Sequence, residues 1–443
     1  MKLKRKIYEQ LLLWKKESQG TTAALVEGAR RVGKSTIVEE FVRNEYDDYL
    51  ILDFAKESEA VRKNFENIED IDTFFQNLFL LKGKALKGNR CAIVFDEVQM
   101  YPLARQSIKY LVADGRYDYI ETGSLISIKK NVKNILIPSE ETRIEMYPLD
   151  FEEFLWALGD EVTAPVIRKA FENRKPLGND IHRRIMDQLR KYMAVGGMPQ
   201  AVIAYAEKQT YDQIDRIKRN IVRLYYEDLK KNDDENREKS SVIFKTIPEQ
   251  LYNHNSHFRM SKVDKNARYK YYNDAIEFID ESKIGNECIN VTDPQIAMEA
   301  FADRSNFKMY MGDTGLLVTQ IMDSKMKTDE NLYKTLIFNK LGINEGMIME
   351  NLIAQMLKAN GHELYFHEFK YREKTYEIDF LTTTDRKLNI IEVKSSSYKQ
   401  HASFDKFREK YRMKLNNQYI LYTKDLSEKD GVTYLPIYMA MCL

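Results

Sequence analysis

A lysine and a serine follow two glycines in the run GARRVGKS, from Gly28 to Ser35, which matches G-x-x-x-x-G-K-[ST] at every fixed position. Glycine at these places lets the backbone wrap, so that successive N–H groups face a phosphate at the start of a helix. Lys34 would bring a positive charge to the β- and γ-phosphates, and the Ser35 hydroxyl would ligate Mg²⁺. We therefore predict that ATP and Mg²⁺ bind at this P-loop, and the residues expected to hold them are Gly28, Arg31, Gly33, Lys34, Ser35 and Thr36.

Two carboxylates end a wholly apolar run further along the chain. Residues 92–95 read as a buried strand and are followed directly by Asp96 and Glu97. A carboxylate at the carboxyl end of such a strand lies beside the P-loop and can hold Mg²⁺, and the next residue is placed to polarise the attacking water. We expect Asp96 to bind the metal and Glu97 to be the general base of ATP hydrolysis.

Two further side chains are candidates with open alternatives. Ser124 ends the next strand-like run, where its hydroxyl could bond the γ-phosphate or the lytic water, or could simply cap a helix or turn. Arg143 could stabilise the charge of the transition state as an arginine finger, within one subunit or across two, or could be a structural arginine at the surface.

A second acidic constellation stands near the end of the chain. Asp379 lies in the run YEIDFLT, and Glu392 follows the apolar run 388–391. If residues 384–387 form a hairpin loop, Thr383 pairs with Leu388 and Asp379 lies opposite Glu392, with Cβ atoms about 5 Å apart. Like charges at that distance repel each other, and a bridging divalent cation would remove the repulsion.

The side chains around this acid pair extend the site. Lys394 shares the face of Glu392 and could steady a water nucleophile or a scissile phosphate. Glu350 lies at the edge of the apolar arc of an expected helix and could reach the same place. The predicted metal ligands are therefore Glu350, Asp379 and Glu392, with Lys394 as a catalytic residue. The alternative is a structural ion cluster in which Lys394 neutralises the acid pair.

The elements that must position these side chains can also be read from the sequence. The first 150 residues alternate strand-like and helix-like segments, which is typical of a mostly parallel sheet in an α/β fold. We expect its strands at 23–26, 49–54, 92–95, 117–121 and 143–147.

The rest of the chain divides into three further regions. We expect an ATPase core with an N-terminal helix over 1–149, a helical region over 150–231, a winged-helix-like region over 242–310 and a second α/β domain over 311–443. The polar run 230–241 reads as a linker. At the start of an expected helix, the basic segment 265–270 (KNARYK) is a candidate for phosphate contact, although a solvated helix start is the alternative.

Bulk composition narrows the class of protein. Of 443 residues, 43% are hydrophobic and 31% charged, which is typical of a globular chain and not of a disordered one. The net charge of +1 means that any surface for nucleic acid must be a local patch. The 3 cysteines offer no zinc motif, and neither a signal peptide nor a membrane span is evident, so we expect a cytoplasmic protein with no membrane association.

The order of these motifs resembles a known family. GARRVGKST, VFDEVQ, TGS and YPLDFEEFL, followed by AVGGMPQAV, FKMYMGDTGLL, IMENLIAQML and EIDFLTT…IIEVKSS, are similar to the prokaryotic AAA-like ATPases that carry a C-terminal domain of unknown function, number 4143. The resemblance implies a P-loop ATPase core, a helical and winged-helix-like middle, and a restriction-endonuclease-like end domain. Carried over by position, it assigns ATPase roles to Lys34, Ser35, Asp96 and Glu97, and a PD-(D/E)xK nuclease-like motif to Glu350, Asp379, Glu392 and Lys394. The family often has glycine where Thr142 precedes Arg143 here.

Three hypotheses of function follow. The first is an ATPase whose nucleotide state controls a metal-dependent, nuclease-like domain that acts on nucleic acid, with DNA the favoured partner. The second is a regulatory switch whose end domain only binds. The third is a remodelling ATPase that assembles into a homo-oligomer and has no role on nucleic acid.

Overall fold

The computed structural model describes residues 1–124, 138–232, 238–253, 257–322, 333, 345–384, 386–395, 401–411 and 415–443, with only the backbone of 232 and 345. The chain forms two compact units, Lys2–Tyr147 and Pro148–Leu443, of which the second includes Met1. Part of the expected linker, 233–237, lies outside the described residues. Among the helices of the described ranges, none is long and apolar enough to cross a membrane.

A parallel sheet forms the centre of the first unit. Its five strands lie in the order β2-β3-β4-β1-β5, and every neighbouring pair is parallel. All five expected strands are present, and the carboxyl ends of parallel strands meet at one edge of the sheet. The bounds are β1 Ala23–Gly28, β2 Asp48–Asp53, β3 Cys91–Asp96, β4 Asp118–Ser124 and β5 Glu141–Met146.

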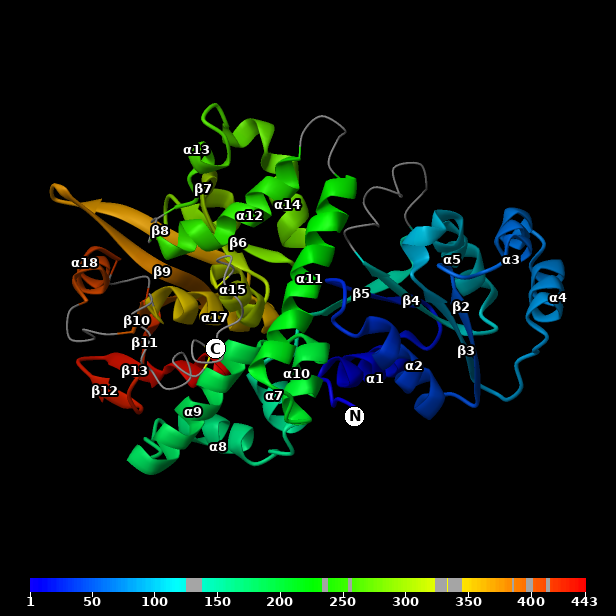
Figure 1. Cartoon of the computed structure of the whole chain (residues 1–443), viewed down its shortest axis with the longest axis horizontal. Coiled ribbons are helices and arrows are strands. Elements are labelled where there is room, and N and C mark those ends of the chain that lie inside the picture. Colours follow the sequence, from blue (N-terminus) through cyan, green and yellow to red (C-terminus); the bar gives the residue numbers. More distant parts are fainter. Residues whose placement is uncertain are drawn as a thin grey trace. The chain divides into compact units, whose positions relative to one another are not determined.

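Helices cover this sheet, as Figure 1 shows. An aromatic cluster that includes Phe54, Phe65, Phe74 and Phe95 packs α3, α4 and α5 against the strands. Asp70 caps α4 by accepting a hydrogen bond from the backbone N–H of Thr73, which satisfies one of the free donors of the first turn. The helices are α1 Ile7–Ser18, α2 Lys34–Glu45, α3 Glu59–Asn64, α4 Ile71–Lys82 and α5 Pro102–Asp114.

The second unit begins with helices. Asp150 and Glu153 form a capping box at the start of α7, where each side chain accepts a hydrogen bond from the other residue's backbone N–H. The helices of this region are α7 Phe151–Ala157, α8 Thr163–Glu172, α9 Asn179–Val195, α10 Pro199–Ala206, α11 Tyr211–Asn232, α12 Lys239–Tyr252, α13 Met260–Val263, α14 Asn273–Glu281 and α15 Thr314–Ile321.

The run AVGGMPQ, residues 194–200, connects α9 to α10. The backbone N–H of Gly197 donates to Oδ2 of Asp313 at 2.6 Å, and the carbonyl oxygen of Gly197 accepts from Leu149 at 2.7 Å. A Cβ atom on Gly315 would lie 2.5 Å from Cα of Gly196, so only glycine allows this close approach. The turn therefore packs closely against the start of α15.

A mixed sheet completes the second unit. Its eight strands lie in the order β12-β13-β11-β10-β9-β8-β6-β7. Helix α17 (Glu345–Ala359) precedes β8, and α18 (Ala402–Tyr411) connects β10 to β11. The strands are β6 Gly285–Val291, β7 Ala302–Met311, β8 Leu364–Tyr371, β9 Lys374–Thr384, β10 Lys387–Lys394, β11 Leu415–Tyr422, β12 Ser427–Lys429 and β13 Val432–Pro436.

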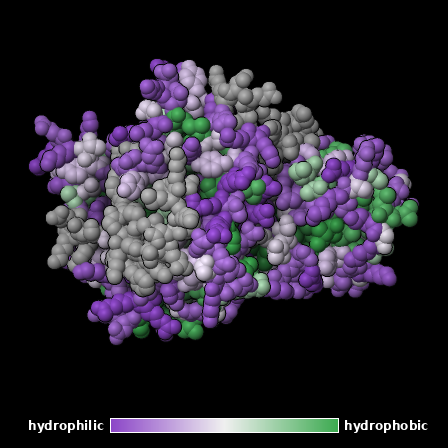
Figure 2. All heavy atoms as spheres, in the orientation of Figure 1, coloured by the Kyte–Doolittle hydropathy of each residue, from purple (hydrophilic) through white to green (hydrophobic). Residues whose placement is uncertain are grey.

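Two features of this unit differ from the sequence-based expectations. Strand β6 pairs with β7 and also with β8, so the boundary expected at 310/311 falls at the end of β7, inside one continuous sheet. The basic segment 265–270 does not start a helix: Tyr269–Tyr271 form a short 3₁₀ turn, and α14 begins at Asn273. Among the coloured residues in Figure 2, hydrophilic ones predominate, which fits the burial of the apolar clusters inside the units.

Candidate functional site

The glycine loop lies between β1 and α2, as the motif predicts. Strand β1 ends at Gly28, and α2 begins at Lys34. Gly28 is paired with Met146 of β5, and a Cβ atom there would lie 2.1 Å from the Met146 carbonyl oxygen. Gly33 has a φ of 101°, in the left-handed region that favours glycine, whereas Arg31 is exposed and adopts a φ of 70° at greater cost.

Lys34 is buried within the loop that it follows. Its Nζ atom donates to the carbonyl oxygens of Gly28 at 3.1 Å and Ala29 at 2.9 Å. Burial lowers the pKa of Lys34 to about 8, although the nearby carboxylates of Glu97 and Asp96 act to raise it. An anionic phosphate would be a better partner for this ammonium group than two neutral carbonyl groups.

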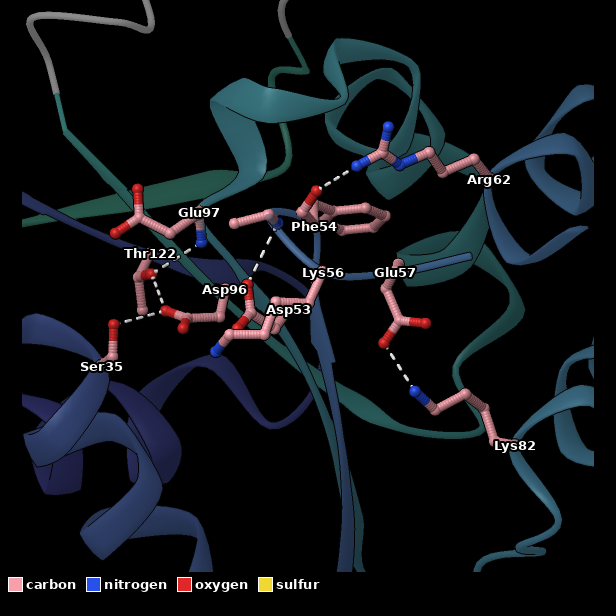
Figure 3. A network of polar contacts seen from close by, with 11 residues as sticks. Ser35, Asp53, Phe54, Lys56, Glu57, Arg62, Lys82, Asp96, Glu97 and Thr122 are labelled. Carbon is pink, nitrogen blue, oxygen red and sulfur yellow. Dashed lines mark hydrogen bonds and ion pairs between the residues drawn. The ribbon is translucent and has the colours of Figure 1, made fainter. Parts of the chain in front are cut away.

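The residue after this lysine belongs to a hydroxyl–carboxylate pair, which Figure 3 shows. Ser35 Oγ donates to Oδ1 of Asp96 at 2.7 Å, which brings together the two side chains expected to hold Mg²⁺. Both Ser35 and the following Thr36 are exposed at the start of α2. Two oxygen ligands at hydrogen-bonding distance fit a metal that keeps most of its own water shell.

Thr122 of β4 joins the same network, and the sequence analysis did not single it out. Its hydroxyl donates to Oδ1 of Asp96 and accepts from the backbone N–H of Glu97 at 3.2 Å. Glu97 adopts a left-handed φ of 54°, and Gln99 donates to its Oε2. These contacts hold the strained backbone of Glu97, which directly follows β3.

Ser124 and Arg143 occupy different places relative to the loop. Ser124 is paired with Gly28 in the sheet, and its buried Oγ atom has no hydrogen-bond partner within the described ranges. Arg143 is exposed on the edge strand β5 and is paired with Leu25, three residues before Gly28. At about 3.3 Å per residue it lies roughly 10 Å back along the strand, which argues against a finger within the same subunit.

Arg5 is a further residue that motif reading did not find. It is 6% exposed, and its guanidinium group donates to the carbonyl oxygens of Val32 at 2.9 Å and Tyr147 at 2.7 Å. Arg5 therefore fixes the carbonyl group just before Gly33 to the residue that ends the first unit.

The hairpin that carries the end-domain site has the predicted register, but Thr384 pairs with Lys387, so the turn is shorter than the expected loop 384–387. Thr383 pairs with Leu388, and the antiparallel pairing continues to Phe380 and Ile391, one step before Asp379 and Glu392. Beyond that step, Oδ2 of Asp379 accepts from the backbone N–H of Val393 at 2.7 Å.

A bulge in β9 lies at this point. Tyr365 pairs with Leu381 and His367 with Ile378, so β9 has one more residue than β8 between these pairs. Ile378 and Leu381 consequently both join the apolar cluster with Phe407 of α18. Bulges re-aim side chains and are frequent next to active sites.

The acid pair and Lys394 lie close to one another in the structure. Oε1 of Glu392 is 2.7 Å from Nζ of Lys394, while its Oε2 is buried and has no hydrogen-bond partner among the residues that the structure describes. Burial raises the pKa of Glu392, which Lys394 opposes. Burial, together with the charges of Glu392 and Glu350, raises the pKa of Asp379 well above its usual value.

Two charged residues that the sequence analysis missed complete this cluster. Nζ of Lys308, in β7, is 2.7 Å from Oε1 of Glu377 and 3.1 Å from Oε1 of Glu350. Tyr310 also donates to Oε1 of Glu350. Burial opposes the charge on Lys308, but the surrounding carboxylates, Glu350 first, raise its pKa well above its usual value.

The residues present fit a metal only in part. Within the described ranges, no group of three His, Cys, Asp or Glu side chains is arranged to hold a metal ion by itself. A divalent cation bound here would therefore have Asp379 and Glu392 as its protein ligands and take the others from water or substrate, as Mg²⁺ commonly does.

The first unit has the arrangement that defines a P-loop ATPase. The phosphate-binding loop follows β1, the acidic pair follows β3, and β4 separates the two strands in a wholly parallel sheet.

Comparison with known families agrees with this class. Residues 21–155 match the family described as an AAA domain, and residues 345–440 match the domain of unknown function DUF4143. The intervening residues 186–327 match a second domain of unknown function, DUF8612. The chain therefore carries an N-terminal AAA domain and a C-terminal DUF4143 domain, and the resemblance stated from the motifs is confirmed.

Individual relatives are distant. An uncharacterized protein of Methanocaldococcus jannaschii is 22% identical over 371 residues, which cover 82% of this chain and 72% of that protein. Among solved structures, a Walker-type ATPase of Pyrococcus abyssi is 12% identical with a TM-score of 0.43, covering 72% of this chain and 96% of its own. Cdc6p of Pyrobaculum aerophilum is 11% identical with a TM-score of 0.26, covering 76% and 94%.

Proposed function

We propose that the first unit binds Mg²⁺-ATP and hydrolyses it with Glu97 as the general base. The observation that carries this proposal is the contact between Ser35 Oγ and Asp96 Oδ1 at 2.7 Å, beside the buried ammonium group of Lys34. Mg²⁺ held by these two oxygens would neutralise charge that develops on the phosphates. Lys34 would leave the carbonyl oxygens of the loop and bind the β- and γ-phosphates.

The surrounding side chains orient the base and the attacking water. Thr122 anchors the backbone of Glu97, and Gln99 holds the carboxylate. The carboxylate accepts a proton from water as the water oxygen attacks the γ-phosphorus and the bond to ADP breaks. We propose that Ser124, which pairs with Gly28, donates to the γ-phosphate or to the water.

Glu97→Gln tests this assignment because it keeps the shape of the side chain and removes the base. ATP should still bind, and turnover should fall by about 100-fold or more, the scale of losing a general base. Fluorescent-nucleotide titration and phosphate release separate the two effects. Normal turnover in this variant would place the base elsewhere.

For the end domain, we propose that Asp379 and Glu392 bind one Mg²⁺ or Mn²⁺ and that Lys394 assists hydrolysis of a phosphodiester, with DNA as the favoured substrate. The supporting observation is the buried Oε2 of Glu392, which has no hydrogen-bond partner within the described ranges, in a group whose other oxygen pairs with Lys394. Bound there, a divalent cation acidifies a water and stabilises charge on the phosphate. Lys394, freed from part of its pairing with Glu392, can donate to a phosphate oxygen. We further propose that the nucleotide state of the first unit controls this activity, in a monomer or a homo-oligomer.

Plasmid nicking distinguishes this site from a structural ion cluster. Asp379→Ala and Lys394→Ala should both abolish Mn²⁺-dependent nicking without changing ATP turnover. Metal binding, measured by calorimetry, should be lost in Asp379→Ala and largely kept in Lys394→Ala. A structural cluster predicts instead no metal binding to the wild type and a stability loss of about 3–5 kcal/mol in Lys394→Ala, because a buried carboxylate would lose its partner. That result would favour a binding-only end domain, as in a regulatory switch.

A further inference from the structure

Lys308 reaches the carboxylates of the end domain from outside the segment that carries them. It belongs to β7, within the region 186–327, whereas Glu350 and Glu377 belong to the region 345–440. Its side chain is 8% exposed, and its ammonium group lies 2.7 Å from Glu377 and 3.1 Å from Glu350. The two carboxylates outnumber this buried ammonium group, so removing Lys308 would leave uncompensated negative charge in the cluster.

The charges of the cluster balance only in part. Four carboxylates, those of Glu350, Glu377, Asp379 and Glu392, face the two ammonium groups of Lys308 and Lys394, which leaves an excess of two negative charges when all are ionised. One divalent cation carries the charge that neutralises this excess. Without Lys308 the excess is three negative charges, more than one divalent cation neutralises, so a second cation could be attracted.

The carboxylates divide between the two lysines. Lys308 holds Glu350 and Glu377, and Tyr310 adds a hydrogen bond to Glu350. At the other end, Glu392 keeps one oxygen for Lys394 and has a second without a hydrogen-bond partner in the described part of the chain. Two-metal sites place cations about 3.5–4 Å apart with carboxylates around both. In this cluster the ammonium group of Lys308 contacts Glu350 and Glu377, the carboxylates that a second metal ion would need.

We propose that Lys308 is a built-in counter-cation that limits the end-domain site to one divalent metal ion, by occupying Glu350 and Glu377 and leaving Asp379 and Glu392 for the metal. This inference rests on the proposed metal site of the end domain. It changes the sequence-based assignment of Glu350, which becomes a partner of Lys308 and not a metal ligand.

Lys308→Gln tests the proposal, because the amide still donates a hydrogen bond but carries no charge. Mn²⁺ is titrated calorimetrically into the full chain without nucleotide, with Asp96→Asn in every variant so that the P-loop does not contribute. We expect one Mn²⁺ per chain with Lys308 and two with Lys308→Gln, whose paramagnetic resonance spectrum should show coupling between the two ions. The matched control, Lys308→Gln with Glu377→Gln, removes one charge of each sign and should return to one Mn²⁺.

Each outcome decides the matter. One Mn²⁺ in Lys308→Gln, as with Lys308, would overturn the role of Lys308 and leave the proposed metal site intact. No Mn²⁺ with Lys308 but one in Lys308→Gln would overturn both the proposed site at Asp379 and Glu392 and the proposal, because Lys308 would then exclude the metal and not limit it to one ion. No Mn²⁺ in either would overturn both. If Lys308→Gln folds only with millimolar Mn²⁺, the metal replaces the ammonium group as proposed, and failure to fold even then overturns the proposal.

Discussion

Nucleotide binding to the P-loop should take up protons at mildly alkaline pH, by an amount that follows from the setting of Lys34. Burial holds the pKa of Lys34 at about 8 in the free protein. A bound phosphate replaces two carbonyl acceptors with an anion, which should return this pKa to its usual value of about 10.4 or above. The complex then binds more protons than the free protein, so affinity falls as the pH rises.

The magnitude follows from the fraction of neutral lysine. Binding one nucleotide should take up about 0.1 proton at pH 7, about 0.5 at pH 8 and about 0.9 at pH 9, and the dissociation constant should rise about tenfold from pH 7 to pH 9. Below pH 7 the effect vanishes, because Lys34 is already charged in the free protein.

Calorimetry in buffers of different ionisation enthalpy measures this uptake. A non-hydrolysable ATP analogue with Mg²⁺ is titrated at each pH, and the slope of the binding heat against buffer enthalpy gives the protons taken up. Lys34→Arg is the matched control, because arginine stays charged throughout this range and should bind, more weakly, without uptake. Equal heats in all buffers at pH 9 for the wild type would refute the reasoning, since Lys34 would then not change its charge.

Two further predictions concern other charged side chains. Asp96→Asn should weaken Mg²⁺-dependent nucleotide binding by about 10- to 100-fold, the scale of one charge-assisted contact, and an unchanged Mg²⁺ dependence in fluorescent-nucleotide titrations would contradict its assignment. Replacing Lys265, Arg268 and Lys270 together with alanine should weaken DNA binding and reduce its salt dependence by up to about three units of slope, and an unchanged slope would move the binding surface elsewhere.

The sequence predicts the ATPase unit well because its signals are local. A glycine loop after an apolar strand, and an acid pair after another, fix which strand ends carry the chemistry, and parallel pairing brings those ends to one edge. The hydrogen-bond network around Asp96 was harder to predict from the sequence. Thr122 looks like any other strand threonine in the sequence. What distinguishes it is its hydrogen bond to Asp96, and that contact depends on β4 lying next to β3 in the sheet.

In the end-domain site, contacts between segments that are distant in the sequence were even harder to predict. Hairpin counting gave the pairing of Thr383 with Leu388, since a short loop leaves few alternatives. It could not give the bulge in β9, because Phe380 and Leu381 are both apolar, so the shift in alternation that the extra residue causes cannot be located from the sequence. Lys308 was missed because a single lysine between apolar residues reads as the exposed face of a strand. Its carboxylate partners lie 42 and 69 residues away in the chain.

The pairing of β6 with β8 has a consequence for how such chains can be recombined during evolution. Leu364, Tyr365 and Phe366 of β8 receive a parallel neighbour from Cys288, Ile289 and Asn290. A gene fusion that carried only the region 345–440 would leave β8 as an open, apolar edge strand, the kind that pairs with other chains and aggregates. Such a fusion would also lose Lys308. We therefore expect β6 and β7 to be inherited together with the region 345–440. Recombination break points in this family should lie before β6 and not at the start of α17.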